Sequence, residues 1–195
     1  MRLVYFILFS LFTFYCSAQK FQSGIIAGIS ASQVSGDNLS GFKKAGIQLG
    51  GYVNYPFNES ASAQFSLYYI DKGSSDPKTN FQIDLSYIET SWSILYDYQG
   101  FVWEAGLLWG ILRDGKTLNY YGVNPEMSDF ENFDVGAKFS LGRQLMPKLF
   151  MFWEYSNTIP FFPIQKHPAS IQGSLNKGKM NSVLCFSFRY LLNEK

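Results

Sequence analysis

The chain has 195 residues, a formal net charge of +1 and an aromatic content of 18%. A nearly neutral chain without a basic tract gives no sign of a nucleic acid or of an anionic surface as partner. Beyond the first residues there is no long apolar run, which excludes a helical membrane protein, whereas the aromatic content suits a membrane barrel with interfacial girdles.

The N-terminus has the features of a secretory signal. Met1-Arg2 gives a basic start, an apolar run covers residues 3–15, and Cys16 and Ala18 put small residues before a cleavage site after Ala18. The run is shorter than the roughly 20 residues of a spanning helix, and the bulky Tyr15 before Cys16 argues against lipidation. We expect a signal peptide at residues 1–18 and one barrel domain at residues 19–195.

A two-residue alternation then defines the predicted strands. Residues 44–57, K-A-G-I-Q-L-G-G-Y-V-N-Y-P-F, show it best, with an apolar parity that ends in aromatics and a parity of small or polar residues. Because side chains alternate between the faces of a strand, this pattern predicts a transmembrane barrel strand with a polar inner face. The predicted strands are residues 21–32, 44–57, 63–72, 82–98, 101–112, 132–142, 148–157 and 179–192.

A few bulky residues break the alternation, because Ile26, Leu95, Phe150 and Phe152 fall on the otherwise polar parity. The fold alternative is a soluble lipocalin-like barrel, which would place the apolar parity inside.

The predicted connections alternate in length. Long polar segments occupy residues 33–42, 72–79, 113–131 and 158–177, and short turns occupy residues 58–60, 99–100 and 146–147. An up-and-down barrel gathers its long loops at one rim and its short turns at the other. The sequence therefore predicts an all-β fold, an eight-stranded antiparallel up-and-down transmembrane β-barrel in the cell outer membrane, with extracellular loops and both termini periplasmic.

The inner parity carries charges of both signs. A barrel of this size has an interior just wide enough for side chains to fill, and burying an ion costs several kcal/mol unless a partner is close. We therefore expect a structural polar network in the lumen, with Lys72 nearer a rim. Its members are Glu89, Glu104, Asp134, Lys138, Glu154 and Arg189.

A narrow ion path and a lipid-modifying enzyme are the two alternatives for these charges. An enzyme of that kind needs a nucleophile with a base beside it, but the only histidine, His167, falls in a proline-rich loop. His167 also lacks neighbours at metal-ligand spacing. Cys185, the only cysteine after cleavage, can form no disulfide within the chain. We expect no catalytic, cofactor-binding or metal-binding residues.

Aromatic side chains on the outer parity predict contact with outer-membrane lipid at the headgroup level. A patch of them could instead hold a protein partner in the envelope, and the oligomeric state is left open. The predicted girdle residues are Tyr55, Trp92, Tyr96, Trp103, Trp109, Trp153 and Tyr155.

Several phrases occur in an order and spacing similar to those of a known family. They are S-G-D-N-L-S-G-F-K-K (35–44), L-S-Y-I-E-T (85–90), W-E-A-G-L-L-W-G (103–110), F-D-V-G-A-K-F (133–139) and F-S-F-R-Y (186–190). Together they resemble the PorT-like outer-membrane β-barrel family of Bacteroidota. The resemblance implies a small eight-stranded outer-membrane barrel, and the founding member of that family is associated with type 9 secretion and gliding.

The function expected from the sequence is that of a non-enzymatic outer-membrane barrel, structural or accessory to a surface or secretion complex. The alternative is a small passive porin-like channel, followed by the lipid-modifying enzyme.

Overall fold

The computed structural model describes residues 21–36, 41–76, 78, 81–119, 122–124, 130–166 and 178–193. The predicted signal peptide and His167 lie outside the described residues.

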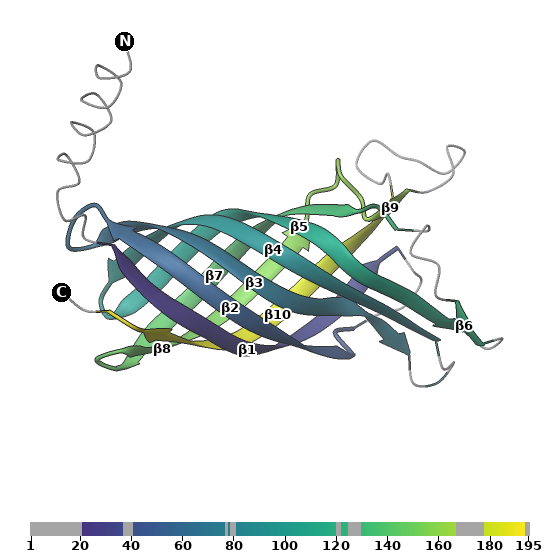
Figure 1. Ribbon diagram of the computed structural model, residues 1–195, viewed down its shortest axis with the longest axis horizontal. Helices are drawn as coiled ribbons and strands as arrows, with labels where there is room; N and C mark the ends of the chain where they lie inside the picture. The colour runs from purple at the N-terminus through teal and green to yellow at the C-terminus, as the bar shows by residue number, and fades with distance from the viewer. Residues whose placement is uncertain are drawn as a thin grey trace, which may run out of the picture.

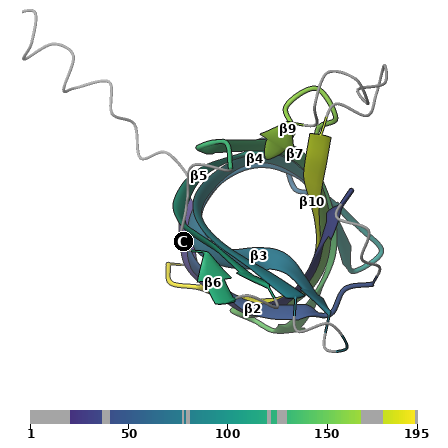
Figure 2. The same ribbon diagram turned by 90° about the vertical axis from the view of Figure 1, so that its right-hand side faces the viewer.

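Eight long strands form a closed antiparallel ring (Figures 1 and 2). Each long strand pairs with the next long strand, and the first pairs with the last. They are β1 (Gln22–Ser35), β2 (Lys44–Pro56), β3 (Ala61–Asp76), β4 (Phe81–Tyr98), β5 (Phe101–Asn119), β7 (Phe133–Met146), β8 (Leu149–Thr158) and β10 (Gly178–Leu191). Two short strands join the ring, β6 (Gly122–Asn124) on β5 and β9 (Gln165–Lys166) on β10. This architecture confirms the predicted fold class.

The pairing register sets the tilt of the strands. Paired residues followed once around the ring from Ser23 lead back to Gln33, which lies 10 residues further along β1. Such a stagger requires strands tilted by about 35–45° to the barrel axis. In Figure 1 the strands run obliquely to the long axis of the barrel. A barrel of eight strands has room inside for side chains.

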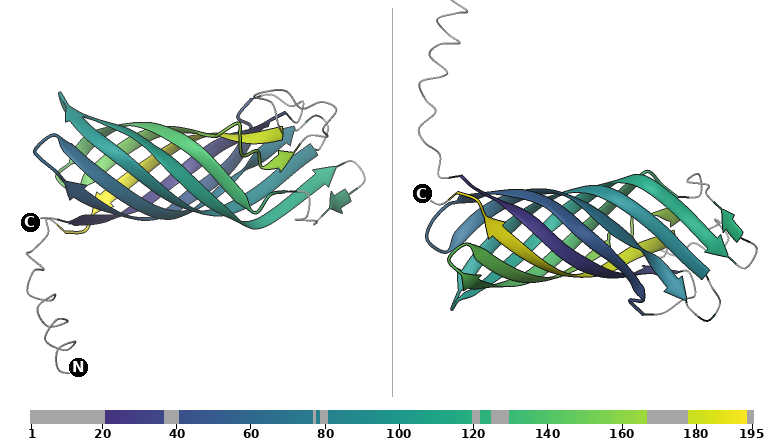
Figure 3. Two further views of the ribbon diagram at one scale, coloured as in Figure 1. Left: turned by 90° about the horizontal axis from the view of Figure 1, so that it is seen from above. Right: turned by 60° about the horizontal axis from the view of Figure 1, so that its bottom comes forward.

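The two ends of the barrel differ. Residues 57–60, 99–100 and 147–148 make short connections at one end, where β1 starts and β10 stops (Figure 3). We call this the turn end and the opposite one the loop end. Gln99 (φ 54°) and Gly100 (φ 79°) both have positive φ, as a two-residue type I′ hairpin turn requires.

Several strands run further than the alternation predicted. β3 continues to Asp76 and β5 to Asn119, through residues that we expected in the loops at 72–79 and 113–131. The β3–β4 ladder is paired as far as Asp76 and Phe81. Outside a bilayer neither face of a strand has to be apolar, so the alternation stops while the backbone ladder continues.

The polarity of the wall is that of a membrane barrel. Leu49 and Val53 are 49% and 42% exposed on the outside, whereas the neighbouring Gln48 is 2% exposed. Glu104 and Arg189, at 1% and 2%, also lie inside. This arrangement is the reverse of the lipocalin-like alternative and rules that alternative out.

Candidate functional site

The lumen contains two clusters of buried charges. Nearer the loop end, Lys72 forms ion pairs with Glu89 and with Asp134, at 3.0 Å for Asp134. Asp134 also accepts hydrogen bonds from Thr158 Oγ1 (2.7 Å) and from Asn181 Nδ2 (2.9 Å). We call these five residues the loop-side cluster; they come from β3, β4, β7, β8 and β10.

The second cluster, which we call the turn-side cluster, has two cations and two carboxylates. Lys138 Nζ lies 2.8 Å from Glu104 Oε1 and 3.1 Å from Glu154 Oε2. Arg189 Nη2 lies 2.7 Å from Glu104 Oε2 and 3.7 Å from Glu154 Oε2. Ser140 Oγ donates to Glu154 at 3.4 Å. Two cations and two carboxylates balance in charge, and each cation contacts both carboxylates.

The structure therefore brings all six predicted network residues into the lumen, each at most 4% exposed. It divides them between the two clusters, and it adds Lys72, which we expected nearer a rim. Lys72 is 2% exposed, since β3 continues to Asp76 and Lys72 therefore lies inside the barrel and not at its rim. Sequence reasoning missed the neutral partners Thr158 and Asn181. Thr158 falls in the predicted loop at 158–177 but is the last residue of β8, and the parity of Asn181 gives no sign of which carboxylate it meets.

Apolar side chains fill the lumen around the loop-side cluster. Ile26, one of the residues that broke the alternation, belongs to this layer. Phe130 and Ile164 enter it from the loop end, at 6% and 0% exposure. The layer comprises Ile26, Val34, Tyr52, Tyr68, Ile70, Ile83, Leu85, Tyr87, Leu112, Phe130, Ile164, Val183 and Cys185.

A smaller apolar layer lies at the turn-end side of the charges. It consists of Leu95, Val102 and Phe152, with Phe150 packed against them. The Arg189 guanidinium lies over the Phe152 ring, 3.7 Å from its centroid. The residues that broke the alternation thus belong to the apolar groups inside the lumen, Ile26 to the loop-side layer and the other three to this smaller layer.

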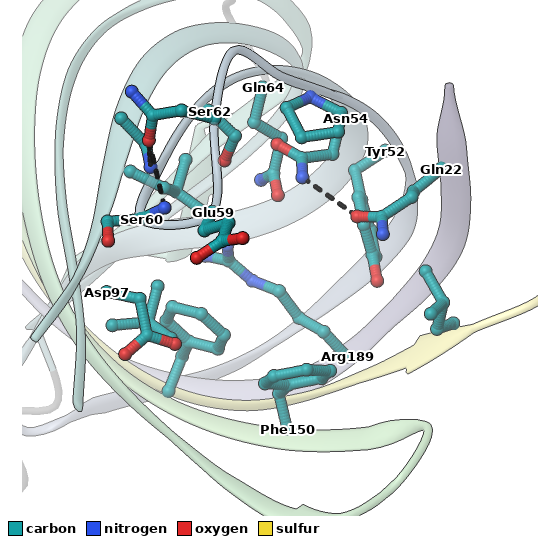
Figure 4. Close-up of a pocket in the computed structure, with 17 residues that line it drawn as sticks. Gln22, Tyr52, Asn54, Glu59, Ser60, Ser62, Gln64, Asp97, Phe150 and Arg189 are labelled. Atoms are coloured by element: carbon teal, nitrogen blue, oxygen red, sulfur yellow. Dashed lines mark hydrogen bonds between the residues drawn. The ribbon is translucent and has the colours of Figure 1, made fainter. Parts of the chain in front are cut away.

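A cavity of about 270 Å³ opens below this layer at the turn end (Figure 4). Tyr52, Gln64 and Phe150 line it from the wall, and Arg189 crosses its floor. Glu59, from the turn between β2 and β3, lies in front of Arg189 in this view. Leu95, Val102 and Phe152 also line the cavity, which therefore passes the apolar layer and reaches Arg189 of the turn-side cluster.

The predicted girdle residues all lie on the outer wall, between 40% and 61% exposed. Tyr55, Tyr96 and Trp103 stand near the turn end of their strands. Trp92 and Trp153 stand nearer mid-strand, between other outward side chains. Contact of these rings with lipid headgroups stays a prediction. The full set is Tyr55, Trp92, Tyr96, Trp103, Trp109, Trp153 and Tyr155.

The described residues contain no group of three or more His, Cys, Asp and Glu side chains placed to hold a metal ion. Within the same residues no helix is long and apolar enough to cross a bilayer. Cys185 is a free, buried thiol packed in the loop-side layer. On the strand extension beyond the apolar wall, a hydrogen bond to Asp114 raises the pKa of Lys116.

A closed, staggered ring with an apolar outer wall and a charged, filled lumen is the fold of small outer-membrane β-barrels. No protein-family model matches the sequence, and no curated protein sequence matches it. Among solved structures the chain is similar to Ail, the attachment invasion locus protein of Yersinia pestis, with 13% identity and a TM-score of 0.53 over 89% of this chain and 99% of Ail.

A second Ail structure, in complex with the heparin analogue sucrose octasulfate, has a TM-score of 0.50 at 13% identity, with the same coverage of both chains. Neisserial surface protein A gives 0.49 at 15% identity, over 89% of this chain and 98% of that protein. At such identities the likeness to Ail shows a shared fold.

Proposed function

We propose that this protein is a non-enzymatic barrel of the cell outer membrane that serves as a structural or accessory component of a surface or secretion complex. The closed lumen carries this proposal. Two charge clusters and two apolar layers occupy the lumen between the loop end and the turn-end cavity, and Arg189 is the cluster residue that lines this cavity. A barrel without an open channel must contact other molecules through its outer wall, its loop end or its turn end.

Two further observations support the outer-membrane location. The fold is shared with Ail at a TM-score of 0.53, and the first 18 residues have the features of a cleavable export signal. The resemblance to PorT-like barrels adds a secretion complex as the kind of partner. Mass determination of protein isolated from membranes tests the signal, with Gln19 expected as the first residue.

The buried carboxylates argue against the enzymatic alternative. Glu104 and Glu154 are both held by Lys138 and Arg189, and Asp134 is held by Lys72, Thr158 and Asn181. A carboxylate that acts as a general base must reach a substrate proton. Glu104, Glu154 and Asp134 do not line the turn-end cavity, and each is at most 3% exposed.

Conductance distinguishes the proposed function from a passive channel. We expect no current steps when the purified barrel is inserted into planar bilayers, because ions would have to cross the buried charge clusters and the loop-side layer. A large porin inserted in the same bilayers provides the positive control. Regular current steps that persist across preparations would overturn the closed-barrel proposal and favour the channel.

Site-specific crosslinking tests the accessory role. A photoreactive residue at Glu59 reports on the turn end, one at Lys116 reports on the loop end, and one at Trp153 serves as a wall control that faces lipid. We expect a discrete protein adduct in native membranes from an end position. Adducts with lipid alone at all three positions would contradict a role in a protein complex.

A further inference from the structure

A short apolar segment leaves the barrel wall between β8 and β9. Its sequence is I-P-F-F-P-I, residues 159–164. Ile159 N donates to Val135 O at 2.8 Å, so the segment starts at the edge of the wall beside β7. Phe162 N donates to Ile159 O at 2.9 Å, which closes a turn with Pro160 at its second position, where the fixed φ of proline suits a turn.

The far side of the segment is fixed inside the barrel. Ile164 N donates to Lys179 O at 2.9 Å, and Ile164 O accepts from Glu131 N at 2.7 Å. The Ile164 side chain is fully buried in the loop-side layer of the lumen. The segment therefore crosses from the outer face to the inner face within a few residues and is held at both ends by backbone hydrogen bonds.

The turn presents two phenylalanine rings outward. Phe161 and Phe162 are 56% and 57% exposed. In Figure 2 the segment between β8 and β9 stands outside the ring of strands. Next to it on β7, Phe133 is 64% exposed and continues the apolar outer wall. If water surrounded these two rings, their exposed apolar surface would be unfavourable in free energy.

Polar groups mark the edge of the wall at the same level. Asn157, the last outward residue of β8 before the segment, donates to Tyr155 Oη at 2.9 Å and to Ser182 Oγ at 3.0 Å. Beyond the segment, Lys166 forms an exposed ion pair with Glu131 at 2.8 Å. The two rings thus lie between the apolar wall and a charged rim, at the level where phenylalanine side chains can bury themselves at the boundary between headgroups and acyl chains.

We propose that Phe161 and Phe162 form an interfacial anchor that inserts into the lipid leaflet at the loop end. Lipid is the occupant because the rings continue the lipid-facing wall through Phe133, and because residues 159–164 carry no charge or polar side chain with which to match a protein surface. Ile164 belongs to the same segment and helps to fill the lumen. The backbone of residues 161–164 therefore connects the two lipid-inserted rings directly to a residue of the loop-side layer.

Spin labels attached to cysteine test the anchor. Phe162→Cys is the probe, in the mature protein with Cys185→Ser, reconstituted in dioleoylphosphatidylcholine vesicles. Phe133→Cys is the matched lipid control and Lys166→Cys the matched water control. The readout is the ratio of collision rates with oxygen, which concentrates in lipid, and with a water-soluble nickel chelate. Heat-dependent migration in gels confirms that each variant is folded.

We expect the oxygen-to-nickel ratio at position 162 to match that at position 133 and to exceed that at position 166 severalfold. A ratio equal to that at position 166 would place the turn in water and overturn the proposal. Protection from both reagents would also overturn it, because it would mean that protein covers the rings. Phe161→Cys, measured in the same way, shows whether both rings insert.

Discussion

At the scale of single residues, Lys138 joins both carboxylates of the turn-side cluster. It is 4% exposed and lies within 3.1 Å of Glu104 and Glu154. Lys138→Met would leave two buried carboxylates with Arg189 as their one cation. Breaking a buried ion pair on one side costs about 3–5 kcal/mol, and we expect a loss of that size in the free energy of unfolding, measured by urea titration in lipid vesicles.

The matched control is Lys116→Met. Lys116 pairs with Asp114 at 3.0 Å on the exposed extension of β5, where both side chains are at least 50% exposed. Solvent screens such pairs, so this variant should unfold at the same urea concentration as the unmodified protein. Equal losses from Lys138→Met and Lys116→Met would show that the lumen is wet enough to screen its charges.

A double substitution separates charge balance from packing. Lys138→Met with Glu154→Gln removes one charge of each sign and leaves the Arg189–Glu104 pair, at 2.7 Å, in place. Because replacing a whole buried pair by neutral groups is often close to neutral, the double variant should be more stable than Lys138→Met alone. A double-mutant cycle measures the coupling. A double variant that loses the sum of the two single losses would contradict a shared ion pair.

The sequence indicated which charges lie inside the barrel, but it did not indicate which charges pair with one another. Parity alone assigned Glu89, Glu104 and Arg189 to the lumen, since a one-residue shift would turn every side chain to the other face. The pairing of Arg189 with Glu104 depends on residues 85 positions apart in the chain and on the stagger of the ring. Neither can be read from a local pattern.

At the scale of strands, Gly73 is the first residue of β3 beyond the predicted strand at residues 63–72. Its φ is 139°, and a Cβ atom there would lie 1.9 Å from the Ile83 carbonyl oxygen on β4. Gly73→Ala combines backbone strain with a backbone clash. Strain of this kind costs about 1–3 kcal/mol, so we expect at least that loss in the free energy of unfolding, with faster hydrogen exchange where β3 pairs with β4.

Gly100→Ala is the control for strain without a clash. Gly100 has a φ of 79° in the turn between β4 and β5, and a Cβ atom there would meet nothing within 4 Å. Its loss in unfolding free energy should be smaller than that of Gly73→Ala. Equal losses of unfolding free energy in the two variants would mean that the Ile83 backbone moves aside and that the clash does not contribute.

The strands could be predicted wherever a bilayer imposes alternation on them. β2 and β8 begin and end within one residue of their predicted bounds. At the loop end, β3 and β5 pass through sequence that looks like loop, because water accepts polar groups on both faces. Phe130 and Ile164 belong to predicted loops and fill the lumen, and local sequence gives no sign that a loop residue turns inward.

At the scale of the whole molecule, the barrel is closed from the loop end inward. The loop-side layer is the larger of the two and includes side chains from the connections, whereas the turn-side layer has Leu95, Val102 and Phe152 with Phe150 beside them. The turn end keeps an open mouth of about 270 Å³. The two ends therefore offer different surfaces, a capped one and a hollow one, and the orientation in the membrane decides which surface each compartment meets.

We predict that the loop end faces the outside of the cell. Outer-membrane barrels place short turns toward the periplasm and longer loops outside, and the predicted export signal would deliver the chain from the periplasmic side. Cysteines introduced singly in a Cys185→Ser background, as Lys116→Cys on the β5 extension and Glu59→Cys in the β2–β3 turn, report on the two ends. A membrane-impermeant maleimide should label position 116 in intact cells and position 59 only after the outer membrane is permeabilised. The reverse pattern would place the hollow turn end at the cell surface, and it would also exchange the leaflet into which Phe161 and Phe162 insert.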